Sequence, residues 1–164
     1  EILLVSPFNP MLVVISKAIP YLLLSVVNLA VILILSVSLL DMPINGSIFL
    51  LIAESILFIL TALSLGLLIS NLVESQQAAM LISLMGMMVP TILFNGFMFP
   101  IENMPVPLQI ISYLIPAKWF YTIVKAIMIK GLGFYAVWKE TLVLAGMVVV
   151  LLSISFKKFK TRLT

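Results

Sequence analysis

An apolar run extends from Tyr21 to Leu40 without a single charged residue, and it constrains the fold more than any other feature. A helix needs about 20 mainly apolar residues to cross the hydrocarbon core of a bilayer. A polar group of the backbone that is left unbonded in lipid is costly, so such a run predicts a spanning α-helix. Three further runs resemble it. Spans are predicted at about residues 18–40, 47–70, 78–99 and 134–156.

The composition agrees with a chain that lies mostly in lipid. Hydrophobic residues make up 63% of the 164 residues and charged residues 9%, against about 45–50% and about 25% in soluble domains. So short a chain cannot bury that much apolar surface in a core of its own. The predicted fold is an all-α polytopic membrane bundle in contact with the lipid bilayer.

The breaks between the runs mark the predicted helix ends. Pro20 stands before the first run, and residues 41–46 form a turn after it that contains proline, asparagine and glycine. Pro90 lies inside the third run, where proline frees a backbone carbonyl and kinks a helix.

The basic residues predict the orientation. Four spans place both ends on one side, and Lys17 together with the basic residues 157–162 assigns that side to the cytoplasm. Four lysines between residues 118 and 139 would then lie outside, which weakens the argument. The basic residues are sparse and border apolar runs, so they favour membrane orientation over nucleic-acid binding.

Residues 100–131 break the hydrophobic pattern. Prolines at positions 100, 105, 107 and 116 prevent one continuous helix, yet the pieces between them are apolar. We expect a helical hairpin that re-enters the membrane from the outside; the alternative is an ordinary outer loop with a helix lying flat. Trp119, Phe120 and Tyr121 beside Lys118 are expected to be interfacial anchors.

The residue inventory argues against an enzyme. The sequence contains no cysteine and no histidine, which removes thiol nucleophiles and histidine bases. Ser16 and Lys17 are adjacent, so on a helix their side chains point about 100° apart and do not form a nucleophile–base pair. No ring of charges indicates a channel filter.

Several stretches resemble one family. They are "GFMFPIENMPVPLQIISYLIPAKWFYTIVKAIMIKG" (96–131), "LSLGLLISNLVESQQAAM" (63–80) and "EILLVSPFNP" (1–10). In this order they resemble type-2 ATP-binding-cassette (ABC) transporter permeases of bacteria. The resemblance rests on Gly-Phe, Phe-Pro, Asn-Met-Pro and Lys-Gly within the first stretch.

The resemblance implies a function and partners. We expect a permease subunit of an ATP-driven exporter in the inner membrane, working by alternating access, with both ends of this chain cytoplasmic. ATP and Mg would be bound by a separate ABC ATPase subunit, since this sequence has no G-x-x-x-x-G-K-[ST] loop. A second permease subunit would complete a homodimer or a heterodimer. The chain is expected to be part of a longer polypeptide, and a passive channel or structural subunit is the alternative.

The resemblance also assigns residues 1–10 to the end of a cytoplasmic coupling segment and residues 11–164 to the permease domain. Contact with the ATPase is expected from Glu1, Leu3, Leu4, Ser6 and Pro7. The two leucines suit a helix-in-groove contact, and the proline ends that helix. The alternative is a helix that lies on the membrane surface.

Polar residues within the spans are further candidates. Glu54 is expected to face the protein interior, either on the translocation path or bonded to a neighbouring helix. Asn28 is a second path candidate, although a bond between helices suits it better. Ala62, Gly66 and Ser70 recur every four residues and predict a face for close helix packing.

The broken outer segment contributes the remaining candidates, which are Pro100, Glu102, Asn103, Met104, Pro105 and Pro116. Asn103 suits a turn or a helix cap better than a substrate gate, because asparagine bonds nearby backbone amides. Nothing in the sequence selects the transported substrate.

Overall fold

The computed structural model describes residues 10–73 and 75–161, and the regular elements within them are all helical. The spanning elements are α1 (Pro10–Ser38), α2 (Ile48–Leu72), the consecutive α3 (Gln76–Ser83), η2 (Leu84–Met88) and α4 (Val89–Phe94), and α7 (Phe134–Thr161). The outer segment contains η3 (Ile101–Asn103), α5 (Val106–Leu114), α6 (Pro116–Val124) and η4 (Lys125–Ile129). Of these, η2 and η4 are π-helical turns and η3 is a 3₁₀ turn.

Four helices are long and apolar enough to cross a membrane. These segments are Ala18–Ser38, Ile48–Leu72, Gln76–Phe94 and Phe134–Lys157. At about 1.5 Å per residue, α2 alone extends about 37 Å, more than the hydrocarbon core of a bilayer. The predicted all-α polytopic bundle with four spans is confirmed.

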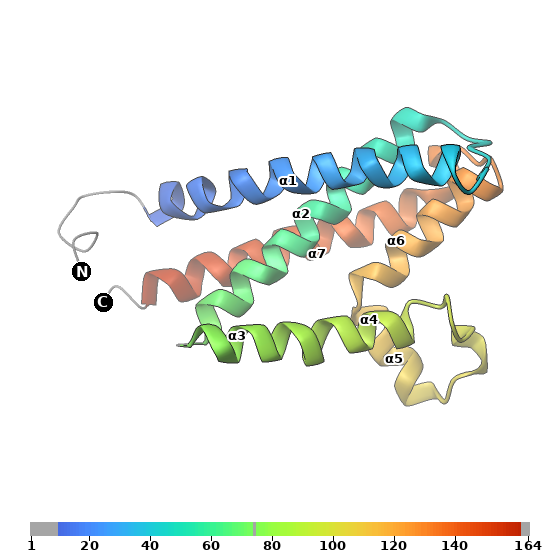
Figure 1. The fold of residues 1–164 in the computed structure, drawn as a ribbon. Coiled ribbons are helices and arrows are strands. Elements are labelled where there is room, and N and C mark those ends of the chain that lie inside the picture. The colour runs from blue at the N-terminus through green and yellow to red at the C-terminus, as the bar shows by residue number, and fades with distance from the viewer. Residues whose placement is uncertain (1–9, 74, 162–164) are drawn as a thin grey trace.

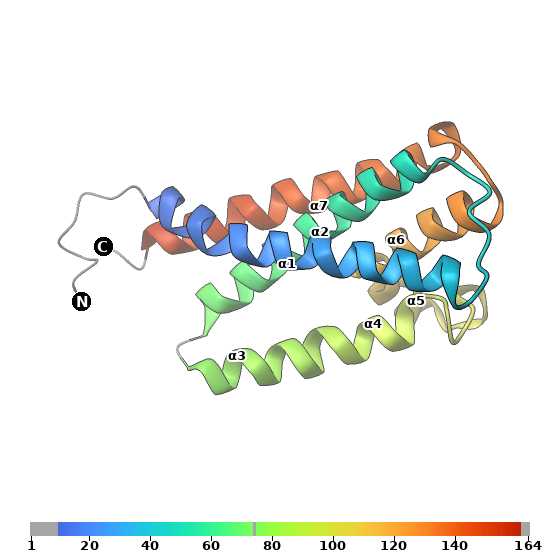
Figure 2. The ribbon, with the colours of Figure 1, turned by 45° about the horizontal axis from the view of Figure 1, so that its top comes forward.

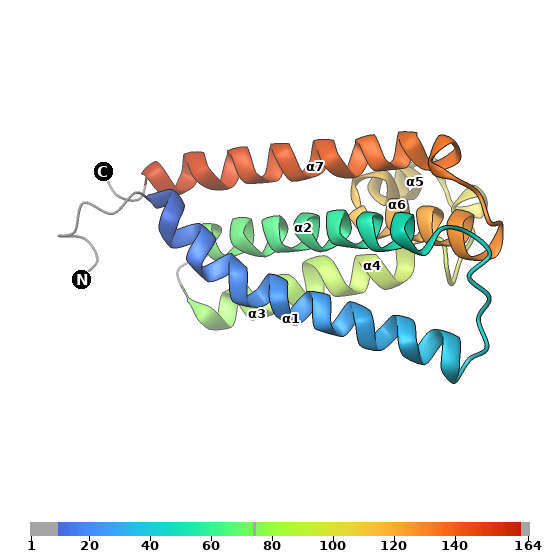
Figure 3. The ribbon, with the colours of Figure 1, turned by 90° about the horizontal axis from the view of Figure 1, so that it is seen from above.

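The centre of the bundle is formed by α2, α6 and α7. Figure 1 and Figure 3 show α7 running beside α2, while α1 and the α3–α4 helix lie on either side of this pair. The fully buried apolar side chains come from these central elements and from η4: Leu51, Ile123, Ile127, Met128, Val137 and Leu144. The core therefore lies in the half of the bundle next to the α1–α2 loop.

The flanking spans are held far more loosely. Neither Ala18–Ser38 nor Gln76–Phe94 has any buried residue in its apolar window. Figure 2 shows the α3–α4 helix at the margin of the bundle and α1 crossing in front of it, and the start of α1 and the end of α7 lie at the opposite end from the α1–α2 loop. Four crossings return the chain to the side on which it started, so the start of α1 and the end of α7 are expected at the same end of the bundle, as the structure has them.

Two helix ends differ from the sequence pattern. Helix α1 begins at Pro10 and runs through Pro20, so the helix end predicted at Pro20 is wrong. Pro20 has no N–H to donate to the preceding turn, but it lies near the start of the span, where water and neighbouring groups can satisfy the backbone. The third span ends at Phe94, before the predicted position 99. An irregularity was predicted at Pro90, and the structure has the η2 π-turn, which ends two residues before this proline.

The outer segment forms a bent hairpin. Helix α5 and the continuous α6–η4 helix meet at an angle of 82°. Figure 1 shows α6 running from the middle of the bundle back to the end where α7 begins. The hairpin thus enters and leaves at the same end, as a re-entrant segment does. Ser112 Oγ donates to the Phe94 carbonyl oxygen at 2.8 Å and ties the hairpin to the third span.

The aromatic residues of α6, for which an interfacial position stays a prediction, have different contacts within the bundle. Phe120 stacks on Phe58 with ring centroids 4.3 Å apart, and Tyr121 meets Phe97 edge to face. Lys118 is buried, with its ammonium nitrogen 3.0 Å from the centre of the Tyr113 ring. Consecutive residues of a helix point about 100° apart, so these side chains reach different neighbours and fasten the hairpin to the bundle.

Candidate functional site

Glu54 lies in α2 and is buried, with 3% of its surface exposed. It is six residues into the helix, about 9 Å from its start at 1.5 Å per residue. Its Oε1 accepts a hydrogen bond of 2.7 Å from Thr141 Oγ1 of α7. Its Oε2 is buried and has no hydrogen-bond partner in the part of the chain that the structure describes. The expected interior position is thus what the structure shows.

A second carboxyl group, that of Glu140 on α7, is only partly buried. Its Oε2 is nevertheless buried and, like that of Glu54, has no hydrogen-bond partner among the described residues. Buried polar atoms normally find a protein or water partner, and those that do not are candidates for unseen water, an ion or a ligand. Each of the two oxygens, in the half of α2 and α7 next to the α1–α2 loop, is therefore a place where a polar group from elsewhere could bind.

A different polar pair joins α2 and α7 at the other end of the bundle. Asn71 Nδ2 donates to Ser155 Oγ at 2.8 Å, and Ser155 is 2% exposed. Together with the bond between Glu54 and Thr141, this pair fixes how far α7 is shifted along α2. Sequence reasoning missed both Thr141 and Ser155, because Thr and Ser are frequent in spans and nothing local identifies their partners.

The small-residue face of α2 looks away from the buried seam with α7. Ala62, Gly66 and Ser70 are exposed, and a Cβ added at Gly66 would meet nothing within 4 Å. No helix of this chain packs closely there, so helix packing stays a prediction for a partner or for another part of the protein.

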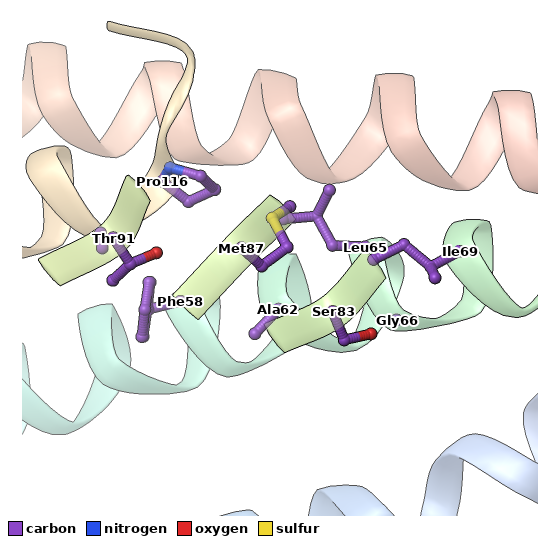
Figure 4. Close-up of a pocket in the computed structure, with 10 residues that line it drawn as sticks. Phe58, Ala62, Leu65, Gly66, Ile69, Ser83, Met87, Thr91 and Pro116 are labelled. Carbon is purple, nitrogen blue, oxygen red and sulfur yellow. The ribbon is translucent and has the colours of Figure 1, made fainter. Parts of the chain in front are cut away.

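The same face lines a groove. A cavity of about 290 Å³ lies between α2, the α3–α4 helix and the start of α6. Figure 4 shows Phe58, Ala62 and Leu65 of α2 opposite Ser83, Met87 and Thr91, with Pro116 at one end. An adjoining cavity of about 450 Å³ shares Gly66, Ile69 and Ser83 with it and extends toward Gln76. The groove is apolar along most of its length.

Asn28 is exposed on α1, and its side chain forms no hydrogen bond within the part of the chain that the structure describes. Glu1, Leu3, Leu4, Ser6 and Pro7 lie outside the described residues.

Asn103 of the broken outer segment was expected to form a turn or to cap a helix. The structure has the turn, but a different residue stands at the N-cap of α5. Asn103 ends the short η3 turn, where its N–H donates to the Pro100 carbonyl, and α5 has Pro105 at its N-cap. Asn103 therefore does not cap α5. Glu102 is exposed, and the Met104 carbonyl accepts from Gln109 Nε2 at 2.8 Å. Pro116 is buried at the start of α6.

Nothing in this arrangement indicates metal chemistry. Among the described residues, no three Asp or Glu side chains lie close enough together to hold a metal ion.

Comparison with known proteins gives a consistent result. Residues 1–129 match a family described as ABC-2 type transporter. Two similar proteins from Escherichia coli K12 are described as probable multidrug ABC transporter permeases. YbhS is 31% identical over 147 residues, covering 90% of this chain and 39% of YbhS. YbhR is 34% identical over 138 residues, covering 84% of this chain and 37% of YbhR.

More distant relatives agree. The inner membrane transport permease YhhJ of Escherichia coli K12 is 28% identical over 98% of this chain and 43% of its own length. The chain thus spans about two fifths of the length of these curated relatives. No solved structure matches the chain significantly.

Proposed function

Because the chain belongs to the ABC-2 type transporter family, we propose that it is the membrane permease region of an ATP-driven exporter. The observation that carries the proposal is the family match over residues 1–129, which includes three spans and the re-entrant hairpin. The names of the relatives YbhS and YbhR favour transport.

ATP hydrolysis takes place on a separate ATPase subunit in this proposal. Residues 1–7 dock on that subunit, and its closure moves the spans between inward-facing and outward-facing states. The support is the absence of a phosphate-binding loop from this sequence and the position of residues 1–7 before α1. The second permease subunit covers the exposed faces of α1 or of the α3–α4 helix, neither of which is buried within this chain.

The transported compound moves along surfaces that this chain leaves open. The groove between α2 and the α3–α4 helix is apolar, and its walls include Met87 and Leu65, which suit hydrophobic compounds of varied shape. Glu54 places a polar group on this path near the outer end of α2, since its Oε2 has no hydrogen-bond partner among the described residues. Asn28 faces outward from α1 and reaches the path only across a subunit interface.

The proposal is tested with the full-length permease and its ATPase in liposomes. We expect the two to copurify, the permease to raise ATP hydrolysis, and an amphipathic dye to move only when ATP is present. Dye or ion flux without ATP would support a passive channel instead. Failure of the two proteins to associate would contradict the ATPase assignment.

A further inference from the structure

The re-entrant hairpin ends at η4, where a helix leaves carbonyl oxygens without partners. The last four carbonyls of a helix have no partner within it and need one from elsewhere. Lys130 N–H donates to the Lys125 carbonyl at 3.3 Å, one residue before these four, and Leu132 N–H donates to the Ala126 carbonyl, the first of the four, at 3.0 Å. The last two carbonyls of the helix are those of Met128 and Ile129.

Asn45, in the loop between α1 and α2, satisfies both. Its backbone N–H donates to the Met128 carbonyl at 3.1 Å. Its side-chain Nδ2 donates to the Ile129 carbonyl at 3.0 Å, across 84 residues of sequence. One residue of a distant loop therefore caps the end of the hairpin.

Two glycines allow this contact. A Cβ added at Gly46 would lie 2.5 Å from the Ile127 carbonyl oxygen, which is closer than real Cβ atoms approach. Gly131 has a φ of +64°, and a Cβ there would lie 3.1 Å from the Asn45 carbonyl oxygen. The loop and the hairpin thus meet backbone to backbone. We name this contact the outer joint; it consists of Asn45, Gly46, Ile127, Met128, Ile129 and Gly131.

The outer joint includes buried core residues and follows the C-terminal end of α1, a helix that is itself loosely packed. No residue of Ala18–Ser38 is buried, whereas Ile127 and Met128 of the joint are buried in the core. Helix α1 begins at Pro10, directly after the segment proposed to contact the ATPase, and ends six residues before Ile44. Its 29 residues extend about 43 Å at 1.5 Å per residue.

We propose that the outer joint is a permanent mechanical link through which displacement of α1 reaches the re-entrant hairpin. Asn45 and Gly46 are positioning residues: they touch no substrate, but they make the hairpin follow α1 when the ATPase pulls on the cytoplasmic end. This inference rests on the proposed exporter function. The inference adds how movement at the ATPase would be transmitted to the outer face, where the transporter opens.

The first experiment separates transport from ATP hydrolysis. In the full-length permease with its ATPase in liposomes, Asn45→Ala is expected to lower dye transported per ATP hydrolysed by about tenfold, within the usual range of coupling between sites. Ser47→Ala is the matched control, since Ser47 Oγ accepts from Leu50 N–H at the start of α2 and, among the described residues, forms no hydrogen bond to the hairpin. An unchanged ratio in Asn45→Ala would overturn the proposal.

A reversible cross-link provides a second variant and tests whether the joint stays closed. The Cβ of Asn45 lies 3.2 Å from a Cβ built at Gly131, a few tenths short of the about 3.5–4.5 Å that disulfides require. In Asn45→Cys/Gly131→Cys, with any other cysteines removed, the reduced protein is expected to be uncoupled. Oxidation is expected to restore transport, because the disulfide replaces the lost side-chain hydrogen bond from Asn45 to the Ile129 carbonyl. Loss of transport on oxidation, with recovery on reduction, would show that the joint must open.

The cross-link also gives a readout that does not depend on transport. The extent of disulfide formation is expected to be the same without nucleotide and with ATP plus vanadate. Cross-linking that falls when nucleotide is added would refute a permanent link, even if the chain proved not to be an exporter. A wild-type protein that fails to transport while cross-linking stays constant would instead refute the exporter function alone.

Discussion

Within the described residues, Thr141 donates the hydrogen bond that the Glu54 carboxyl group accepts. Replacing Thr141 therefore measures how much this bond contributes to the stability of the fold. Thr141→Val keeps the shape of the side chain and removes the hydroxyl donor. The lost contact is the 2.7 Å bond to Glu54 Oε1. Because Oε2 already has no hydrogen-bond partner, the variant leaves both carboxyl oxygens unbonded in a buried place.

The expected loss of stability depends on the buried carboxyl group that the substitution leaves without a hydrogen-bond donor. Hydrogen bonds between spanning helices average only about 0.6 kcal/mol, because the separated helices find other partners. A buried acceptor that loses its last donor costs about 1–3 kcal/mol. We therefore expect Thr141→Val to lower the free energy of unfolding by about 1.5–3 kcal/mol.

A double-mutant cycle isolates the pair. Glu54→Leu removes the group that would otherwise be stranded, so the double variant Glu54→Leu/Thr141→Val is expected to be little worse than Glu54→Leu alone. Unfolding is measured by titrating detergent-solubilised protein with a denaturing detergent and following tryptophan fluorescence.

The control lies on the same helix. Ser153 is exposed, and its hydroxyl donates to the Val149 carbonyl of its own helix. Ser153→Ala is therefore expected to change stability by less than about 0.5 kcal/mol. Additive single-variant effects at positions 54 and 141, with a coupling energy below about 0.5 kcal/mol, would refute the contact between α2 and α7.

Three further predictions concern coupling, the groove and the inner end of the seam. Replacing Leu3 and Leu4 by Glu is expected to release the ATPase during copurification while membrane insertion, measured by fractionation, stays normal; retained ATPase would contradict the coupling assignment. Gly66→Leu is expected to fill the groove and lower dye transport severalfold without lowering stability, because nothing lies within 4 Å of a Cβ there; undiminished transport would exclude the groove from the path. Asn71→Ala removes the bond to Ser155 and is expected to lower the free energy of unfolding by about 1 kcal/mol; no change in detergent unfolding would show that this pair does not hold α2 to α7.

The four spans could be predicted because each depends on a local property. An uncharged run such as Tyr21 to Leu40 is costly anywhere except in lipid or a large core, whatever surrounds it. The same reasoning failed at Pro20, where helix α1 continues through the proline. A proline is a weak boundary signal near the start of a span, where the next residues are strongly apolar and the backbone can reach water.

The candidate site was less accessible to sequence reasoning. The interior position of Glu54 follows from the cost of a carboxyl group in lipid, but its partner Thr141 depends on how α7 is shifted along α2. Asn45 and Gly46 were predicted only as a turn, since their contact with η4 is separated by more than 80 residues of sequence. Long-range register of this kind is not encoded in any local pattern.

The central claim is that the proline-broken segment turns back at the outer face, so that the chain crosses the membrane four times. Its most direct test places single cysteines at Asn103 and Lys158 in the cysteine-free sequence and labels intact cells with a membrane-impermeant maleimide. The account predicts that position 103 is labelled in intact cells and that position 158 is labelled only after the membrane is opened. Labelling of both positions from the same side would contradict the four-span topology and the re-entrant hairpin together.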